Sequence, residues 1–166
     1  VRTFTRPVPR SEVAVLGRPL PGERESGDDC VVLRGEGALL VAVADGLGHG
    51  REARLASRRA LDAVAAAQAP AAAALGELLA RAAAALEGTR GAVLSLVRVD
   101  LATREVTHVG VGDVRVALLG PGGATLLPAS AGVLSGRPGA RLRLREVRGA
   151  LSPHGALLLC TDGLRS

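Results

Sequence analysis

The sequence predicts a single α+β domain built on a largely antiparallel sheet or sandwich. Helical periodicity is confined to one block, residues 51–88, and short strand-like runs lie before and after that block. Short turns rich in glycine and aspartate separate several of these runs. Because the helices are grouped together and do not alternate with strands, an α+β class is favoured over a parallel α/β class. A chain of 166 residues can bury one core, so we expect residues 1–166 to form one domain.

The N-terminal third predicts three strands. Four prolines interrupt the first 25 residues, so only Glu12–Leu16 is expected to be a strand, at a sheet edge. Cys30–Leu33 predicts a second strand, and Gly35-Glu36-Gly37 predicts the hairpin turn that follows it. Ala38–Ala44 is an unbroken apolar run, which is typical of a strand buried on both faces.

The central block predicts two helices. From Arg51 to about Gln68 apolar residues recur at helical spacing, with arginines on another face. A second helix is expected from Pro70 to Gly88, where the glycine is a stop signal. Glu77 and Arg81 are spaced to form an i,i+4 ion pair on it.

The remaining residues predict short strands joined by turns. The expected strands are 92–99, 105–109, 114–119, 124–127, 141–147 and 156–160. The last of these is wholly apolar, which predicts a buried strand. Arginine alternates with leucine in 141–145, which predicts a half-exposed strand.

Composition argues against several function classes. The net charge of +5 would suggest nucleic-acid binding, but every basic residue is arginine in a chain rich in alanine and glycine. We attribute the charge to compositional bias and expect no nucleic-acid partner, since the stacking aromatics of single-strand binders are also absent. Cys30 and Cys160 lie in no zinc or disulfide pattern, which favours a reduced, cytoplasmic setting. We expect no membrane span, because no apolar stretch is long enough.

The stretch Ala38–Gly50, ALLVAVADGLGHG, carries the strongest functional signal. Asp45 directly follows the buried run and is followed by three alternating glycines. A carboxylate at that position loses hydration unless a partner compensates it, and a metal ion is such a partner. The glycines allow backbone groups to approach a ligand closely. We therefore predict a metal-binding site at Asp45.

Two further acids occupy equivalent places. Asp162 follows the last strand in Thr161-Asp162-Gly163, and Asp113 follows Gly112 at another strand junction. Acids at equivalent strand ends can converge, and an all-oxygen ligand set selects Mg²⁺ or Mn²⁺. Two such ions can activate a water for attack on phosphorus, which predicts phosphate-ester hydrolysis.

These motifs, in this order, resemble metal-dependent serine/threonine phosphatases of the PPM (PP2C) type. The resemblance covers about residues 26–166 and is carried by Ser26-Gly27-Asp28, Val43–Gly50, Val111–Arg115 and Thr161–Leu164. The Asp-Gly-Leu-Gly signature and Leu134-Ser135-Gly136-Arg137-Pro138 look most like the RsbX-type feedback phosphatases of the bacterial stressosome. The resemblance implies a PP2C-like β-sandwich flanked by helices, and phosphorylated stressosome scaffold proteins with STAS domains as partners.

The resemblance also implies roles for individual residues. Asp45 would bridge two Mn²⁺ or Mg²⁺ ions, the Gly46 carbonyl would complete one coordination shell, and Asp162 would bind the second ion. Asp28 would hold the waters of the site, and Asp113 would join the same cluster or a third, weaker ion.

The sequence departs from the family pattern at two places. Leu47 stands where eukaryotic members have a histidine proposed as general acid, so His49 does not inherit that role. The family supplies a last metal-binding aspartate from a C-terminal strand, whereas this sequence ends at Ser166, so we expect the domain to lack that end of the fold and its second ion to bind more weakly.

Each of these side chains also fits a simpler structural role. Asp45 could cap a helix, Asp162 could be a turn residue, and Asp113 could pair with Arg115. Asp29 is expected to be solvated. We assign substrate binding to Arg24, which could hold a phosphate bidentately, and to His49; a surface arginine and a loop histidine are the simpler alternatives. The competing function is a catalytically inactive, phosphatase-like module that binds phosphoproteins.

Overall fold

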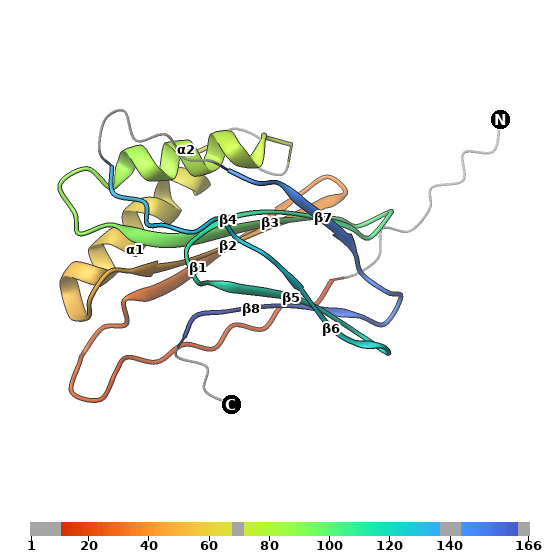
Figure 1. The fold of residues 1–166 in the computed structure, drawn as a ribbon, viewed down its shortest axis with the longest axis horizontal. Helices are drawn as coiled ribbons and strands as arrows, with labels where there is room; N and C mark the ends of the chain where they lie inside the picture. The colour runs from red at the N-terminus through yellow and green to blue at the C-terminus, as the bar shows by residue number, and fades with distance from the viewer. Residues whose placement is uncertain (1–10, 68–71, 137–143, 163–166) are drawn as a thin grey trace.

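Two antiparallel sheets lie face to face in the computed structural model, which describes residues 11–67, 72–136 and 144–162 (Figure 1). The first is five-stranded, in the order β1-β2-β3-β4-β7: β1 (Asp28–Gly35), β2 (Ala38–Gly46), β3 (Ala92–Asp100), β4 (Glu105–Val111) and β7 (Val147–Ala150). The second is three-stranded, in the order β6-β5-β8: β5 (Arg115–Gly120), β6 (Gly123–Leu127) and β8 (Ala156–Cys160). Helices α1 (Gly50–Ala65) and α2 (Leu75–Ala85) cover the outer face of the five-stranded sheet.

The five-stranded sheet is covered on both faces because its central strands are apolar on both. Leu40, Ala42 and Ala44 of β2 pack in the core beneath the helices. Leu39 and Val41 alternate with them and pack in a second core, against the three-stranded sheet. Asp45 continues the second set, so its position in β2 is on the face toward the three-stranded sheet. No helix among the described residues is long and apolar enough to cross a bilayer.

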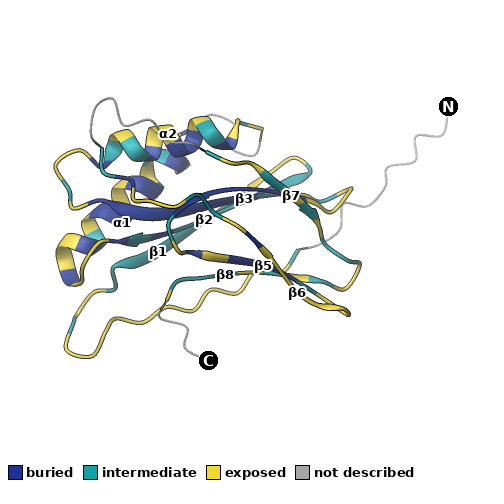
Figure 2. Ribbon diagram, in the orientation of Figure 1, coloured by how far each residue is buried: buried dark blue, intermediate teal, exposed yellow. Residues whose placement is uncertain are grey.

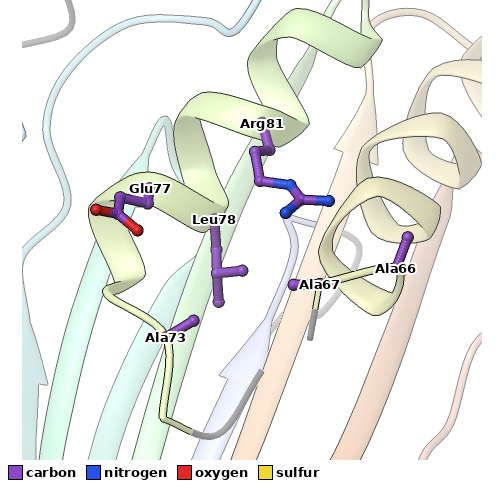
Figure 3. A pocket seen from close by; sticks show the side chains of 6 residues that line it. All are labelled: Ala66, Ala67, Ala73, Glu77, Leu78 and Arg81. Atoms are coloured by element: carbon purple, nitrogen blue, oxygen red, sulfur yellow. The ribbon is translucent and has the colours of Figure 1, made fainter. Parts of the chain in front are cut away.

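Most predicted elements are confirmed. The predicted apolar stripes of both helices are buried, and Gly37 and Gly88 adopt positive φ angles of 72° and 74° at the predicted hairpin and helix stop. The second helix begins at Leu75; the predicted start at Pro70 lies outside the described residues. The predicted Glu77–Arg81 pair is not formed, because the two side chains point apart (Figure 3).

Three strand predictions are wrong in whole or in part. Residues 11–20 form no strand, and Leu16 is 98% exposed, because the apolar side chains of this segment have no core to pack on. Residues 144–146 are also irregular, and the strand forms at Val147–Ala150 instead, where β4 offers a pairing edge; residues 141–143 lie outside the described part. β8 forms where predicted but is only half-buried: Leu157 and Leu159 pack on the core between the sheets, and Leu158, on the other face, is 39% exposed (Figure 2).

Candidate metal centre

Asp28 and Asp45 are direct cross-strand neighbours. The β1–β2 register pairs Asp28 with Asp45, and the adjacent hydrogen bond from the Gly46 amide to the Gly27 carbonyl measures 3.2 Å. That bond makes Gly27 and Gly46 the hydrogen-bonded pair, so Asp28 and Asp45 form the non-hydrogen-bonded pair, in which side chains lie closest. Two half-buried carboxylates thus sit side by side at one end of the sheet.

Two glycines let helix α1 press against this end of the sheet. A β-carbon on Gly46 would overlap the carbonyl of Ala53, and one on Gly27 would lie 2.9 Å from the Ala53 side chain. The first turn of α1 is therefore in direct contact with the backbone that carries both acids. Gly27 and Gly46 thus have a packing role here, and the predicted approach of the Asp-Gly backbone to a ligand stays a prediction.

The three-stranded sheet brings Asp113 and Asp162 to the same end. Arg115 of β5 pairs with Cys160 of β8. Continuing that antiparallel register by two residues places Asp113, before β5, opposite Asp162, after β8. Both residues are exposed. Thr161 links the two sheets, because its hydroxyl donates a 2.9 Å hydrogen bond to Oδ2 of Asp28.

Electrostatic repulsion marks these four acids as one cluster. Burial, the largest cause, raises the pKa of the Asp45 carboxyl from 3.8 to about 7; the charge and hydrogen bond of Asp28 come next, followed by the charges of Asp162 and Asp113. Near neutral pH the Asp45 carboxyl is therefore partly protonated, and a divalent cation can replace that proton.

The donor set fits a hard divalent cation. All the clustered side chains offer carboxylate oxygens, and the Gly46 carbonyl lies near Gly27 at the same strand ends, 3.4 Å from the position of a β-carbon there. No three His, Cys, Asp or Glu side chains within the described ranges are gathered closely enough to hold one ion by themselves. An ion among these acids would therefore take much of its shell from water and from the backbone, as Mg²⁺ commonly does.

Comparisons with known proteins identify the family. The family described as stage II sporulation protein E (SpoIIE) matches residues 35–165. This chain belongs to the SpoIIE family. Phosphoserine phosphatase RsbX of Bacillus subtilis (strain 168) is 32% identical over 144 residues, which span 86% of this chain and 69% of that protein.

Solved structures agree with this assignment. RsbX in complex with magnesium superposes with a TM-score of 0.78 at 27% identity, covering 90% of this chain and 72% of that one. A structure from work on the bacterial stressosome as a modular system that controls secondary messenger signalling has a TM-score of 0.78 at 32% identity, covering 89% and 74%. The PP2C phosphatase domain of Bacillus subtilis SpoIIE, 18% identical with a TM-score of 0.72, shares the fold. The PP2C-like fold is thereby confirmed, and the chain is an RsbX-like phosphatase domain.

The two residues predicted to bind substrate lie in one contact region of this SpoIIE-family domain. His49 immediately precedes α1 and is 67% exposed, and its Nδ1 lies 2.5 Å from Oε1 of Glu23. Glu23 is the neighbour of Arg24, which is exposed and has no ion pair within the described residues. The contact of His49 with Glu23 thus holds the segment that carries Arg24. No hydrogen bond or ion pair of the described structure joins His49 or Arg24 to the four clustered acids.

Asp29 and Asp113 have surroundings that differ from the predicted ones. Asp29 is not simply solvated, since its Oδ2 lies 3.4 Å from Arg54 and 3.8 Å from Arg58. Asp113 forms no ion pair with Arg115 in the described structure, and it acts on the Asp45 pKa instead.

The contact between Arg90 and Gly48 was not predicted from the sequence. The register that pairs Gly46 with Ala92 continues through a 3.0 Å bond from the Leu47 amide to the Gly91 carbonyl, which places Arg90 opposite Gly48. Its Nη1 lies 2.8 Å from the position of a β-carbon on Gly48, so this glycine leaves room for the guanidinium. No pattern in residues 88–91 marks the contact, because it depends on pairing between distant segments.

A polar pair, His108 and Ser95, is buried in the interior. Nε2 of His108 lies 3.2 Å from the Ser95 hydroxyl, and both side chains are fully buried. Burial lowers the pKa of His108 to about 4, so the ring is neutral at physiological pH. A shallow hollow between the end of α1 and the start of α2 lies away from the acids and is lined by alanines, Leu78, Glu77 and Arg81, so we give it no role (Figure 3).

Proposed function

We propose that this SpoIIE-family domain is a Mn²⁺- or Mg²⁺-dependent phosphatase that removes phosphate from phosphoserine or phosphothreonine in stressosome proteins. The observation that carries the proposal is the carboxyl of Asp45, its pKa raised to about 7 by burial and by three neighbouring acids. A site that concentrates negative charge in this way favours hard divalent cations. The RsbX relatives, one of them solved with magnesium, support the choice of ion.

Each acid has a distinct part in this proposal. Asp45, with acids on both sides, would bridge two cations, with the Gly46 carbonyl and Asp162 as further ligands. Asp113, exposed at the rim, would contribute to a weaker position. When bound, the cations supply positive charge to the phosphate oxygens and lower the pKa of water.

Asp28 would orient the attacking water. Its carboxyl accepts a hydrogen bond from Thr161 and shares another with the carboxyl of Asp45, and a carboxylate has further lone pairs that can accept a proton or a hydrogen bond from water. The water oxygen forms a bond to phosphorus as the bond from phosphorus to the serine oxygen breaks. The serine oxygen must then take up a proton; Leu47 at the motif position has none to give, so we propose water as the donor.

Phosphate release from stressosome scaffold proteins with STAS domains, phosphorylated on serine or threonine, tests the proposal. We expect release with Mn²⁺ or Mg²⁺, none with excess chelator, and none from Asp45→Asn. A small aryl phosphate run in parallel separates substrate choice from chemistry. Hydrolysis of the aryl phosphate alone would contradict the stressosome substrates. Tight phosphoprotein binding without hydrolysis of either compound would contradict the enzymatic proposal and favour the inactive binding module.

A further inference from the structure

Arg54 connects helix α1 to the backbone of Asp28. It lies in the second turn of α1, and its side chain is 31% exposed. Nη1 donates a 3.2 Å hydrogen bond to the carbonyl oxygen of Asp28, and Nη2 lies 3.4 Å from Oδ2 of Asp29. One guanidinium therefore binds two consecutive residues at the start of β1.

The start of β1 needs such a contact. Among the described strands, β1 is at the edge of the five-stranded sheet and pairs with β2. Because Asp28 and Asp45 form a non-hydrogen-bonded pair, the amide and carbonyl of Asp28 point away from β2. The amide is bound by the Ser26 hydroxyl at 3.2 Å, and Arg54 binds the carbonyl. Within the described part of the chain, Arg54 is the hydrogen-bond partner of this carbonyl.

We propose that Arg54 is a positioning residue, which holds the carboxylate of Asp28 beside Asp45 through the Asp28 carbonyl and Asp29. The inference rests on the proposed function. Arg54 donates to the backbone and pairs with Asp29, so it acts through Asp28 and takes no part in the reaction. The planar fork of a guanidinium suits this task, since it fixes two acceptors in one geometry.

Arg58 provides a matched control. It lies one turn further along α1 and approaches the same Oδ2 of Asp29, at 3.8 Å. Its side chain is 56% exposed, and it makes no contact with Asp28 in the described structure. Arg58→Gln therefore removes the same charge from the same helix face without removing the bond to the Asp28 carbonyl. A difference between the two variants reports that bond and excludes a general change in charge.

The experiment compares the parent with Arg54→Gln, Arg54→Lys and Arg58→Gln. Calorimetric titration with Mn²⁺, phosphate release as a function of Mn²⁺ concentration, and metal-free amide hydrogen exchange over residues 27–30 are measured. We expect Arg54→Gln to raise the Mn²⁺ dissociation constant and half-activating concentration about tenfold, as about 1.4 kcal/mol would. Exchange should accelerate at the same residues, while the KM for phosphoprotein changes less than twofold. Arg54→Lys should restore part of each effect, because lysine keeps the charge and one donor.

Several results would overturn the inference. Equal behaviour of Arg54→Gln and Arg58→Gln would assign the effect to charge alone. Unchanged exchange at residues 27–30 would show that Arg54 does not hold the strand. If Arg54→Gln fails to fold, Arg54→Lys decides by the same measurements. If the parent releases no phosphate, the proposed function fails, but Mn²⁺ binding and amide exchange still decide the role of Arg54.

Discussion

The two sheets contribute to the acidic cluster in different ways. Asp28 and Asp45 come from neighbouring strands of the five-stranded sheet, are half-buried, and are pressed on by α1 through two glycines. Asp113 and Asp162 flank strands of the three-stranded sheet and are exposed. The central strands of the first sheet are covered on both faces, whereas in the second sheet β6 is largely exposed and β8 is only half-buried (Figure 2). The cost of placing negative charge in the protein therefore falls mainly on Asp28 and Asp45. We expect substitutions on that half of the site to change activity and stability more than substitutions at Asp113 and Asp162.

The largest effect should come from Asp45. Asp45→Asn removes the charge between the two cations, so metal-dependent phosphate release should fall at least about 1,000-fold, or about 4 kcal/mol in the barrier. Asp113→Asn, on the exposed half, should cost no more than about tenfold. Initial rates at saturating Mn²⁺ measure both. Equal losses would show that the two sheets contribute alike, and a loss below about threefold for Asp45→Asn would contradict the assignment.

The second comparison concerns glycines. Gly46→Ala places a β-carbon on the Ala53 carbonyl, so α1 must shift, and we expect a loss of about 3 kcal/mol in the free energy of unfolding. Gly122, in the turn between β5 and β6, has no atom within 4 Å of a β-carbon position, and Gly122→Ala should change stability by less than about 1 kcal/mol. Urea unfolding of both variants measures the two changes in the free energy of unfolding. Equal changes would show that the contact between α1 and Gly46 is not tight.

The third prediction uses pH to probe the polar group between the sheets. The pKa of His108 is about 4 in the folded chain and near 6.5 when unfolded, so the unfolded state binds more protons between these values. Stability should therefore fall as pH decreases, by about 2 kcal/mol from pH 6.5 to 4.5.

His108→Gln supplies the control for this pH effect. The variant should lose that part of the pH dependence while keeping any constant offset from the lost Ser95 contact. Parallel denaturation curves for parent and variant across this range would contradict a buried neutral histidine.

The smallest effect should be at the far edge of the five-stranded sheet. Arg148 of β7 lies 3.1 Å from Glu146 and 3.7 Å from Glu105, and its side chain is 69% exposed. Glu146→Gln should change stability by less than about 0.5 kcal/mol, because exposed pairs gain little in water. A loss above about 1 kcal/mol would show that this edge, unlike the rest of the exposed surface, depends on charge.

Features set by residues close together in the sequence could be predicted from it. Asp45 and Asp162 were predicted as site residues because each stands at the end of an apolar run, and the helices were predicted because their apolar stripes repeat over several turns. Contacts between distant segments were missed. Arg54 and Asp28 are 26 residues apart, Thr161 and Asp28 are 133 apart, and no local pattern marks either contact. Glu12–Leu16 failed for the same reason, since alternation alone cannot supply the sheet edge that a strand needs.

The hydrogen bond from Thr161 to Asp28 has a consequence for assembly. Asp28 and Asp45 meet through a two-residue hairpin, a contact that closes early and at little entropic cost. The contact with Thr161 must close a loop of 133 residues, so it forms only after the intervening strands are in place. As the polypeptide leaves the ribosome, one half of the acidic cluster is available long before the other. A nascent chain therefore carries Asp28 and Asp45 as a pair before Thr161 and Asp162 have been synthesised.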